Sequence, residues 1–334
     1  MKHTPLLAAA FSLLAAPVLA EEVNVYSYRQ PELIAPLMEA FSAQTGIEVN
    51  IAFLNKGMIE RLVAEGARSP ADVILTTDVA RLAAAVEAGV TQKVQSAALE
   101  ANIPAIYRDP DDQWFGITMR ARVVFASKEA VAPGEVTTYE DLADAKWRGR
   151  ICTRSGTNAY TLGLVAAYLA HHGEADTRTW LEGLKANLAR KPQGNDRAQV
   201  KAVWAGLCDI ALGNTYYMGK MLANPDQVQW AQSVNVIFPS FEGGGTHVNI
   251  SGMALAAHAP NRDAAVQLME FLASPEAQEI YAEVNYEYPL APGTRPSQLV
   301  ASWGSFTPDN INLMEIARLR PAALRLVQEV DFDG

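Results

Sequence analysis

Two extended segments near the middle of the chain decide its architecture. They read Arg120-Ala121-Arg122-Val123-Val124-Phe125-Ala126 and Val234-Asn235-Val236-Ile237-Phe238-Pro239. Both contain the β-branched and aromatic residues that are typical of strands. Each lies between stretches in which strand-like and helix-like patterns alternate. We expect the two segments to carry the chain from one lobe to another and back, and so to form a hinge.

Strands alternate with helices before the first of these segments. Val23–Tyr26 is a short β-type run, and the stretch from Leu33 to Phe41 places its apolar side chains on one helical face until Gly46. An alternating stretch, Ile47–Phe53, and a buried-type strand, Asp72–Leu75, follow. This order predicts a parallel sheet covered by helices.

The same alternation resumes between the two segments. Arg150–Thr153 reads as a strand, residues 158–171 as a long helix, and Cys208–Leu212 as a strand that leads into another helix. After the second segment comes a glycine-rich loop at 242–245, and Asn249–Leu255 then reads as one more strand of the first lobe. The pattern therefore predicts a second α/β unit.

We expect an α/β protein with the two-lobe fold of periplasmic binding proteins, similar to type II, with two interlobe crossing strands. The predicted N-lobe comprises residues 21–119 and 241–290, and the predicted C-lobe comprises 120–240 and 291–334. A cleft between two such lobes can close around a ligand.

The composition is that of a folded protein. Of 334 residues, 49% are hydrophobic and 19% are charged. The net charge is −10, with 27 Lys and Arg against 37 Asp and Glu, and no basic run is present that could neutralise phosphates. Nucleic acid is therefore not an expected partner.

The N-terminus has the order of a secretory signal. Met1-Lys2-His3 precedes an apolar run from Leu6 to Ala16, and small residues ending at Ala20 precede Glu21. The run is too short to span a bilayer. We expect cleavage after Ala20 and export to the periplasm; the alternative is a buried first helix.

Export places the two cysteines in an oxidising compartment. Cys152 and Cys208 each lie on a predicted strand that leads into a candidate ligand-bearing loop. Adjacent parallel strands would bring them within disulfide reach, so we expect a bridge, with two buried thiols as the alternative.

Tyrosines follow two of the predicted strands. Tyr216 and Tyr217 lie in Gly213-Asn214-Thr215-Tyr216-Tyr217, and Tyr160 follows Ser155-Gly156-Thr157-Asn158-Ala159 at the start of the long helix. Ligands bind at such strand-to-helix junctions of α/β sheets, so the three phenols are expected to converge. Phenolate oxygens are hard anionic ligands that suit ferric iron.

A different reading of these tyrosines stays open at this point. In it, the phenol rings stack on the cleft wall of a receptor for a small anion, a polyamine or a sugar. No G-x-S-x-G, H-E-x-x-H or P-loop motif is present, so we do not expect an enzyme.

The mature chain resembles, from end to end, the periplasmic ferric-iron-binding proteins of bacterial iron-uptake ABC transporters. The resemblance implies that Tyr160, Tyr216 and Tyr217 are ferric ligands, and that a monomer delivers iron to a membrane permease with its cytoplasmic ATPase. The motifs that carry it are Val25-Tyr26-Ser27-Tyr28-Arg29-Gln30-Pro31, Ser69-Pro70-Ala71-Asp72-Val73, Asp112-Gln113-Trp114-Phe115-Gly116, Arg120-Ala121-Arg122, Arg154-Ser155-Gly156, Ala189-Arg190-Lys191-Pro192-Gln193-Gly194, Gly213-Asn214-Thr215-Tyr216-Tyr217 and Asn249-Ile250-Ser251-Gly252.

The chain departs from other branches of that family in the N-lobe. Transferrin-like members have a metal-binding His where this chain has Gln30 and a Glu where it has Thr77, and another branch has a Tyr where it has Pro31. The resemblance therefore implies no ferric ligand from the N-lobe. Asp78 is a weak alternative ligand that we expect to cap a helix.

Three tyrosinates balance the charge of Fe³⁺ but leave an octahedral ion short of oxygen ligands. We expect a synergistic bidentate anion, carbonate, to complete the shell, as in the tyrosine-plus-carbonate branch that the chain resembles. Arg29, Arg120 and Arg122, together with the helix start from Ser155 to Asn158, are the candidates to bind it. The alternative for each arginine is an ion pair at the surface or between the lobes.

Overall fold

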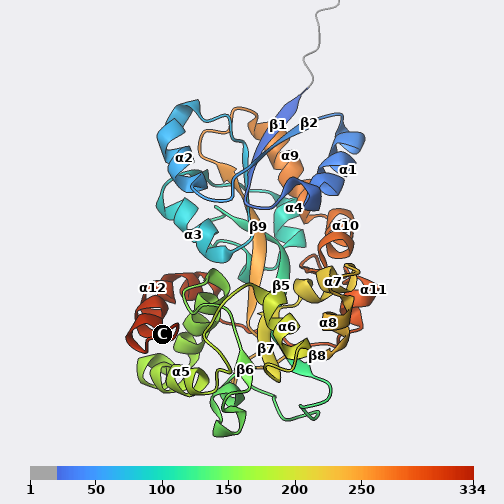
Figure 1. Ribbon diagram of the computed structural model, residues 1–334. Helices are drawn as coiled ribbons and strands as arrows, with labels where there is room; N and C mark the ends of the chain where they lie inside the picture. The colour runs from blue at the N-terminus through green and yellow to red at the C-terminus, as the bar shows by residue number, and fades with distance from the viewer. Residues whose placement is uncertain (1–20) are drawn as a thin grey trace, which may run out of the picture.

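The computed structural model describes residues 21–334. The predicted signal peptide, residues 1–20, lies outside the described residues. Two lobes lie one above the other, and the long strands β5 (Phe115–Ser127) and β9 (Val248–Ala256) run between them (Figure 1). No helix among residues 21–334 is long and apolar enough to cross a membrane.

The N-lobe sheet has the strand order β2-β1-β3-β9-β5. Strand β1 (Glu22–Ser27) is parallel to β2 (Glu48–Phe53) and β3 (Val73–Thr76), as the alternation of strands and helices predicts. Strand β9, which the sequence predicts as one more strand of this lobe, is antiparallel to β3 and β5. The other elements of this lobe are α1 (Ala35–Thr45), α2 (Met58–Glu65), α3 (Val79–Glu87), β4 (Thr91–Gln92), α4 (Ala97–Asn102), α9 (Arg262–Ala273), α10 (Pro275–Asn285) and β10 (Tyr288–Pro289).

Strand β5 belongs to both sheets, as the first crossing segment predicts. Its first part, Phe115–Ala121, pairs with β9, and its second part, Arg122–Ser127, pairs with β7 (Ile210–Asn214) and β8 (Val234–Ile237). Nearly every residue of β5 is buried. Burial on both faces explains why the apolar stretch Val123–Ala126 lacks the alternation of a half-buried strand.

The second predicted crossing is wrong in its position. Strand β8 pairs with Val124–Ser127, inside the C-lobe sheet, and Phe241 still packs on Tyr139 of that lobe, with 4.6 Å between the ring centroids. The chain crosses at β9, whose nine residues are all buried. Because β8 is only half-buried at the edge of a sheet, its extended sequence did not distinguish it from a crossing strand.

The C-lobe places β6 (Ile151–Cys152) parallel to β7, with β5 antiparallel to β7. The long helix α5 (Ala159–Ala186) extends beyond the predicted end at 171, with a kink at Gly173, which has a φ of 76°. Helix α12 (Leu313–Glu329) packs against α5 and also reaches α3 of the N-lobe. The remaining helices are α6 (Asp196–Trp204), α7 (Tyr216–Leu222), α8 (Val228–Gln232) and α11 (Gln298–Ala301).

A disulfide joins Cys152 at the end of β6 to Cys208 just before β7, with 5.9 Å between their Cα atoms. The two strands are parallel neighbours, and Cys152 lies beside Ala211 in the register. The bridge therefore fixes the two strands from which the tyrosine-bearing junctions emerge.

Replacing both cysteines by serine is expected to lower the free energy of unfolding by about 4 kcal/mol. The bridge spans 56 residues, and its loss lets the unfolded chain gain the entropy of an open loop of that length. Denaturant titration of the oxidised parent and the Cys152→Ser/Cys208→Ser variant measures the difference. Equal unfolding midpoints and slopes would refute this prediction.

Candidate metal centre

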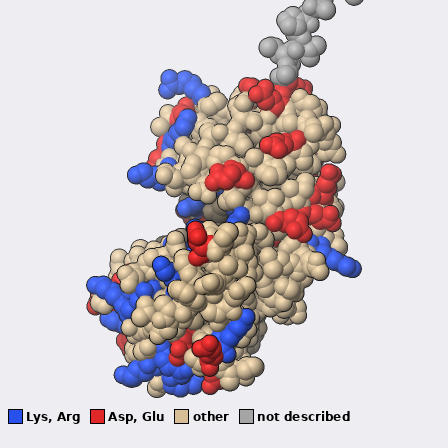
Figure 2. All heavy atoms as spheres, turned by 45° about the vertical axis from the view of Figure 1, so that its right-hand side comes forward, with Lys and Arg blue, Asp and Glu red and all other residues tan. Residues whose placement is uncertain are grey.

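A cavity of about 410 Å³ lies between the lobes. Figure 2 shows a hollow at the junction of the two lobes, with basic side chains at its edge. Four basic side chains and no acidic side chain line the cavity. The complete lining is Tyr28, Arg29, Gln30, Leu33, Phe53, Thr77, Arg120, Tyr160, Arg197, Tyr216, Tyr217 and Lys220.

The three predicted tyrosines meet in this cavity. Tyr160 is the second residue of α5, and Tyr216 and Tyr217 open α7 directly after β7. The Oη atom of Tyr216 lies 3.3 Å from that of Tyr160, and the rings of Tyr216 and Tyr217 have centroids 4.2 Å apart. Two junctions that are 56 residues apart in the sequence thus bring their phenols to one point.

A buried carboxylate, Asp196, fixes the backbone of the loop before α7. Asp196 accepts a hydrogen bond from the backbone N–H of Asn214 at 3.0 Å and pairs with Arg122 at 2.8 Å and with Arg154 at 3.1 Å. The carboxylate is therefore satisfied on both oxygens. It fixes the backbone just before Tyr216 without reaching the cavity as a ligand.

The metal-free site favours protonated phenols. Burial raises the pKa of Tyr216 well above its ordinary value, and the nearby Tyr160, Tyr217 and Asp196 raise it further. Burial and Asp196 also raise the pKa of the Tyr217 phenol. A strongly charged cation is needed to displace these protons, because it alone offsets the cost of placing phenolate charges together in a buried site.

Of the predicted anion-binding arginines, Arg120 has free capacity. It is 2% exposed, and its Nη1 atom donates to Ser251 Oγ at 3.3 Å. Its Nε and Nη2 atoms have no hydrogen-bond partner among residues 21–334. A buried guanidinium without a carboxylate partner is costly, so its place on the cavity wall suits an anion.

The other two arginines are ion-pair partners, which is the alternative that the sequence left open. Arg29 lines the cavity but is paired with Glu287 at 2.7 Å and donates to Ser251. Arg122 is paired with Asp196 and is not part of the cavity lining. Its Nε and Nη2 atoms have no partner among residues 21–334, and it lines a small cavity beside Tyr160, so its role near the anion stays a prediction.

A small polar cavity of about 10 Å³ lies behind Tyr160, between Arg120, Arg122 and His247. Its volume is close to that of one water molecule. Burial lowers the pKa of His247 to about 3, so this imidazole is neutral and is not a source of positive charge for the anion.

The structure does not bring the predicted anion site at the start of α5 into the cavity. The Ser155 hydroxyl and the Gly156 N–H both donate to the carboxylate of Asp333, the latter at 2.7 Å. Asn158 caps the helix by accepting from the Tyr160 N–H at 3.0 Å. Neither Ser155 nor Asn158 lines the cavity, because a carboxylate from the end of the chain occupies this helix start.

Asp78 caps α3, as expected. Its Oδ1 atom accepts from the Ala80 N–H at 2.9 Å and pairs with Arg320 of α12 at 2.6 Å, and its Oδ2 atom accepts from Asn249. Arg320 also donates to the carbonyl of Ala159, next to Tyr160. Asp78 thus connects the two lobes and is not in the cavity lining.

Asp78→Asn is expected to lower the free energy of unfolding by about 3 kcal/mol, because Arg320 keeps its charge in a largely buried place without a counterion. Since Asp78 does not reach the cavity, the visible spectrum measured after addition of ferric iron should be the same for the variant and the parent. The exposed Asp111→Asn is the control for both measurements. A shifted absorption band would instead make Asp78 a ligand.

Arg197 and Lys220 also line the cavity, and the sequence analysis did not identify them. The Arg197 guanidinium lies 5.8 Å from the centroid of the Tyr217 ring, and Lys220 Nζ donates to the carbonyl of Val284 at 3.0 Å. Burial and the charges of Arg29 and Arg197 lower the pKa of Lys220. Lys220 could have been found from its place three residues after Tyr217, whereas nothing in the sequence near Arg197 points to the cleft.

The N-lobe contributes Gln30 and Thr77 to the lining, and Pro31 is not part of it. Among residues 21–334, no group of three or more His, Cys, Asp and Glu side chains could hold a metal ion. Within the described chain, the converging tyrosines are therefore the donor set that suits a hard cation.

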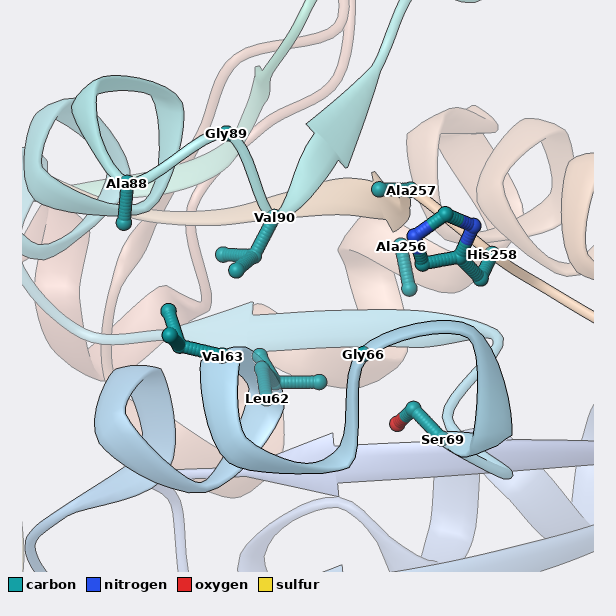
Figure 3. Close-up of a pocket in the computed structure, with 10 residues that line it drawn as sticks. All are labelled: Leu62, Val63, Gly66, Ser69, Ala88, Gly89, Val90, Ala256, Ala257 and His258. Atoms are coloured by element: carbon teal, nitrogen blue, oxygen red, sulfur yellow. The ribbon is translucent and has the colours of Figure 1, made fainter.

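A second pocket, of about 180 Å³, lies within the N-lobe and shares no residue with the tyrosine cavity (Figure 3). Small and apolar residues of α2, the end of α3 and the end of β9 form most of its wall. Ser69 and His258 are its polar side chains, so it lacks the convergent polar groups of a ligand site.

The sequence matches the bacterial extracellular solute-binding protein family over residues 26–279. It is 46% identical over 315 residues to Iron uptake protein A1 of Synechocystis. The alignment covers 93% of this chain and 88% of that relative. The chain belongs to the ferric-iron-binding branch of that family. Solved structures of this branch superpose on both lobes.

Ferric iron-binding protein A of Mannheimia haemolytica, solved in an open conformation, is 52% identical to this chain. The two structures superpose with a TM-score of 0.90, and the superposition covers 94% of this chain and 100% of the Mannheimia chain. The Trichodesmium protein solved in complex with iron and citrate ligands is 42% identical, with a TM-score of 0.89 over 93% of this chain and 99% of the other. The two-lobe α/β fold predicted from the sequence is thus confirmed.

Proposed function

We propose that this protein captures ferric iron in the periplasm and delivers it to the permease and ATPase of an ABC transporter. The phenolates of Tyr160, Tyr216 and Tyr217 are the ferric ligands, and a bidentate carbonate held by Arg120 completes the shell. The protein acts as a monomer and without catalysis. The observation that carries the proposal is the convergence of three phenols, with 3.3 Å between the Tyr160 and Tyr216 oxygens, beside a buried arginine that lacks a carboxylate partner.

Charge balance supports this assignment of roles. Three phenolates neutralise Fe³⁺, and the charge of the carbonate then faces Arg120, whose Nε and Nη2 atoms are free to donate. Arg29 contributes little net charge because Glu287 neutralises it. The ion is therefore bound from the C-lobe, and Gln30 and Thr77 of the N-lobe close over it as neutral side chains.

Closure requires that the lobes move about β5 and β9. We keep the proposed N-lobe at 21–119 and keep 291–334 in the proposed C-lobe. We move the return of the chain into the N-lobe from 241 to Val248, where β9 begins, so the first C-lobe segment becomes 120–247. The interlobe contacts at Arg320 and Asp78 lie beside this hinge.

Metal analysis with a visible spectrum tests the proposal. Metal-free protein given ferric iron and bicarbonate should bind one iron per chain and develop a tyrosinate-to-iron charge-transfer band. Without bicarbonate the same protein should bind iron more weakly, with a shifted band. A protein that stays colourless and binds no iron would favour the second candidate, a receptor for a small organic anion, which the four basic side chains of the lining also suit.

A further inference from the structure

The two helix starts that carry the tyrosines are held in different ways. The backbone before Tyr216 is fixed by Asp196, a carboxylate of the same lobe. The start of α5, which carries Tyr160, is held through the backbone carbonyl of Ala159, which accepts a hydrogen bond from Nη2 of Arg320. Its support therefore comes from α12, a separate helix near the end of the chain.

The carboxylate that holds Arg320 lies in the other lobe. The Nη1 atom of Arg320 pairs with Oδ1 of Asp78 at 2.6 Å, while Nη2 donates to the Ala159 carbonyl. Asp78 is itself fixed, because it accepts from the Ala80 N–H at the start of α3 and from the Asn249 side chain on β9. One guanidinium thus joins the cap of an N-lobe helix to the helix start that carries a proposed ferric ligand.

The packing around Arg320 makes this contact well defined. Helix α12 lies between α3 and α5 and packs against both (Figure 1). The Arg320 side chain is 14% exposed and that of Asp78 is 3% exposed, so solvent screens the pair only weakly. The turn that follows Arg320 is anchored by the buried residues Ala323, Leu326 and Val327. The guanidinium is therefore fixed with respect to both lobes.

Tyr160 needs such support because of its place in the helix. It is the second residue of α5, and the ends of helices fray unless groups from outside hold them. Asn158 binds the Tyr160 N–H, and the Ala159 carbonyl has two lone pairs, so it can accept from Arg320 as well as within the helix. A metal site needs its ligands within about 0.5 Å of the productive geometry, and a shift of this backbone moves the phenol oxygen with it.

We propose that Arg320 is a positioning residue for Tyr160. It is not part of the cavity lining, and it acts by fixing the backbone from which the phenol extends. Through Asp78 and Arg320, the N-lobe, which provides no ferric ligand in the proposed function, determines where one of the C-lobe ligands lies. The inference rests on the proposed function and adds a residue that controls the geometry of the ferric shell.

A purely structural role for the ion pair makes a different prediction. A pair that only stabilises the fold would lower the free energy of unfolding when it is removed. It would leave the iron affinity and the absorption of the folded protein unchanged. The bond to the Ala159 carbonyl favours the positioning role, because an ion pair with Asp78 does not require it.

Arg320→Met is the test variant, since methionine keeps an unbranched apolar side chain and loses both contacts. The matched control is Arg325→Met on the same helix, where the arginine pairs with Glu174 and is 50% exposed. Arg320→Met leaves the Asp78 carboxylate without its counterion, which can prevent folding. Asp78→Asn/Arg320→Met removes that charge, and it is compared with Asp78→Asn, which keeps Arg320 and an amide oxygen that can accept from it.

Arg320→Met should weaken ferric binding about tenfold, the effect of one lost hydrogen bond from a charged group. The charge-transfer band per bound iron should be weaker, as in Tyr160→Phe, because the Tyr160 phenol is coordinated for less of the time. In the Tyr160→Phe background, Arg320→Met should change the affinity by less than about twofold, whereas in the Tyr216→Phe background its tenfold effect should remain. Arg325→Met should match the parent. Competition against a coloured chelator gives each affinity, at a temperature at which every variant is folded.

Equal effects of Arg320→Met in the Tyr160→Phe and Tyr216→Phe backgrounds would overturn the inference. So would a folded Arg320→Met variant with the affinity and absorption of the parent. Failure of the proposed function gives a different result, in which the parent develops no tyrosinate band and Tyr160→Phe binds iron as the parent does. The inference would then fall with it.

Discussion

Replacing Tyr216 by phenylalanine is expected to reduce the affinity for ferric iron by about two to four orders of magnitude. The substitution removes one of three phenolates and leaves about one positive charge of the ion unbalanced in a buried site, a cost of about 3 to 5 kcal/mol. Tyr217→Phe and Tyr160→Phe should act in the same direction. Competition against a coloured chelator measures the affinity, and the visible band reports on the ligands that remain.

The same substitution should leave the fold unchanged. The Tyr216 hydroxyl makes one hydrogen bond, to Tyr160, and the ring keeps its contact with Tyr217. Tyr168→Phe is the matched control, because Tyr168 lies on α5 two turns after Tyr160 and packs on Trp180 away from the cavity. If all three site variants keep the parent's affinity and band, the tyrosines are not the ligands.

Acid is expected to release the iron, beginning with the anion. In the metal-free protein the pKa values of Tyr216 and Tyr217 are raised, so both phenols hold protons that the ion must displace. Iron binding therefore releases protons, and the affinity rises with pH and falls on acidification. Carbonate protonates more readily than a metal-bound phenolate, so mild acid should shift the visible band before iron leaves.

Arg120→Gln is expected to move this transition to higher pH, because carbonate loses the buried cation that stabilises its charged form. Absorbance followed from neutral to acidic pH, with and without bicarbonate, gives the transition for the variant, the parent and the exposed control Arg148→Gln. A band that ignores bicarbonate and persists until the protein unfolds would show that protein groups complete the shell without the anion.

The alternation of strands and helices was sufficient to predict the two-lobe architecture and the first crossing strand. Strand β5 is buried along nearly its whole length, and its sequence combines Arg120 and Arg122 with the β-branched and aromatic residues that are typical of strands. The second crossing was misplaced from β9 to β8, because both read as extended segments. Only pairing partners, which are a property of the tertiary structure, separate a strand at the edge of one lobe from a strand that joins two.

The tyrosines of the site could be predicted because each follows a strand, where the sheet itself brings ligands together. The charged neighbours could not be predicted in the same way. Glu287 neutralises Arg29 from 258 residues away, and Asp333 occupies the helix start at Ser155 from 178 residues away. Such partners follow from the packing of distant segments. Sequence patterns could therefore identify the candidate anion-binding arginines, but not which of them lacks a carboxylate partner.

Anomalous diffraction at the iron edge, from a crystal of the iron-loaded protein grown in bicarbonate, tests the central claim most directly. We expect a single peak in the cavity, within bonding distance of the phenol oxygens of Tyr160, Tyr216 and Tyr217, and a bidentate anion between the ion and Arg120. A peak that lies away from these three oxygens, or the absence of a peak in the cavity, would contradict the account.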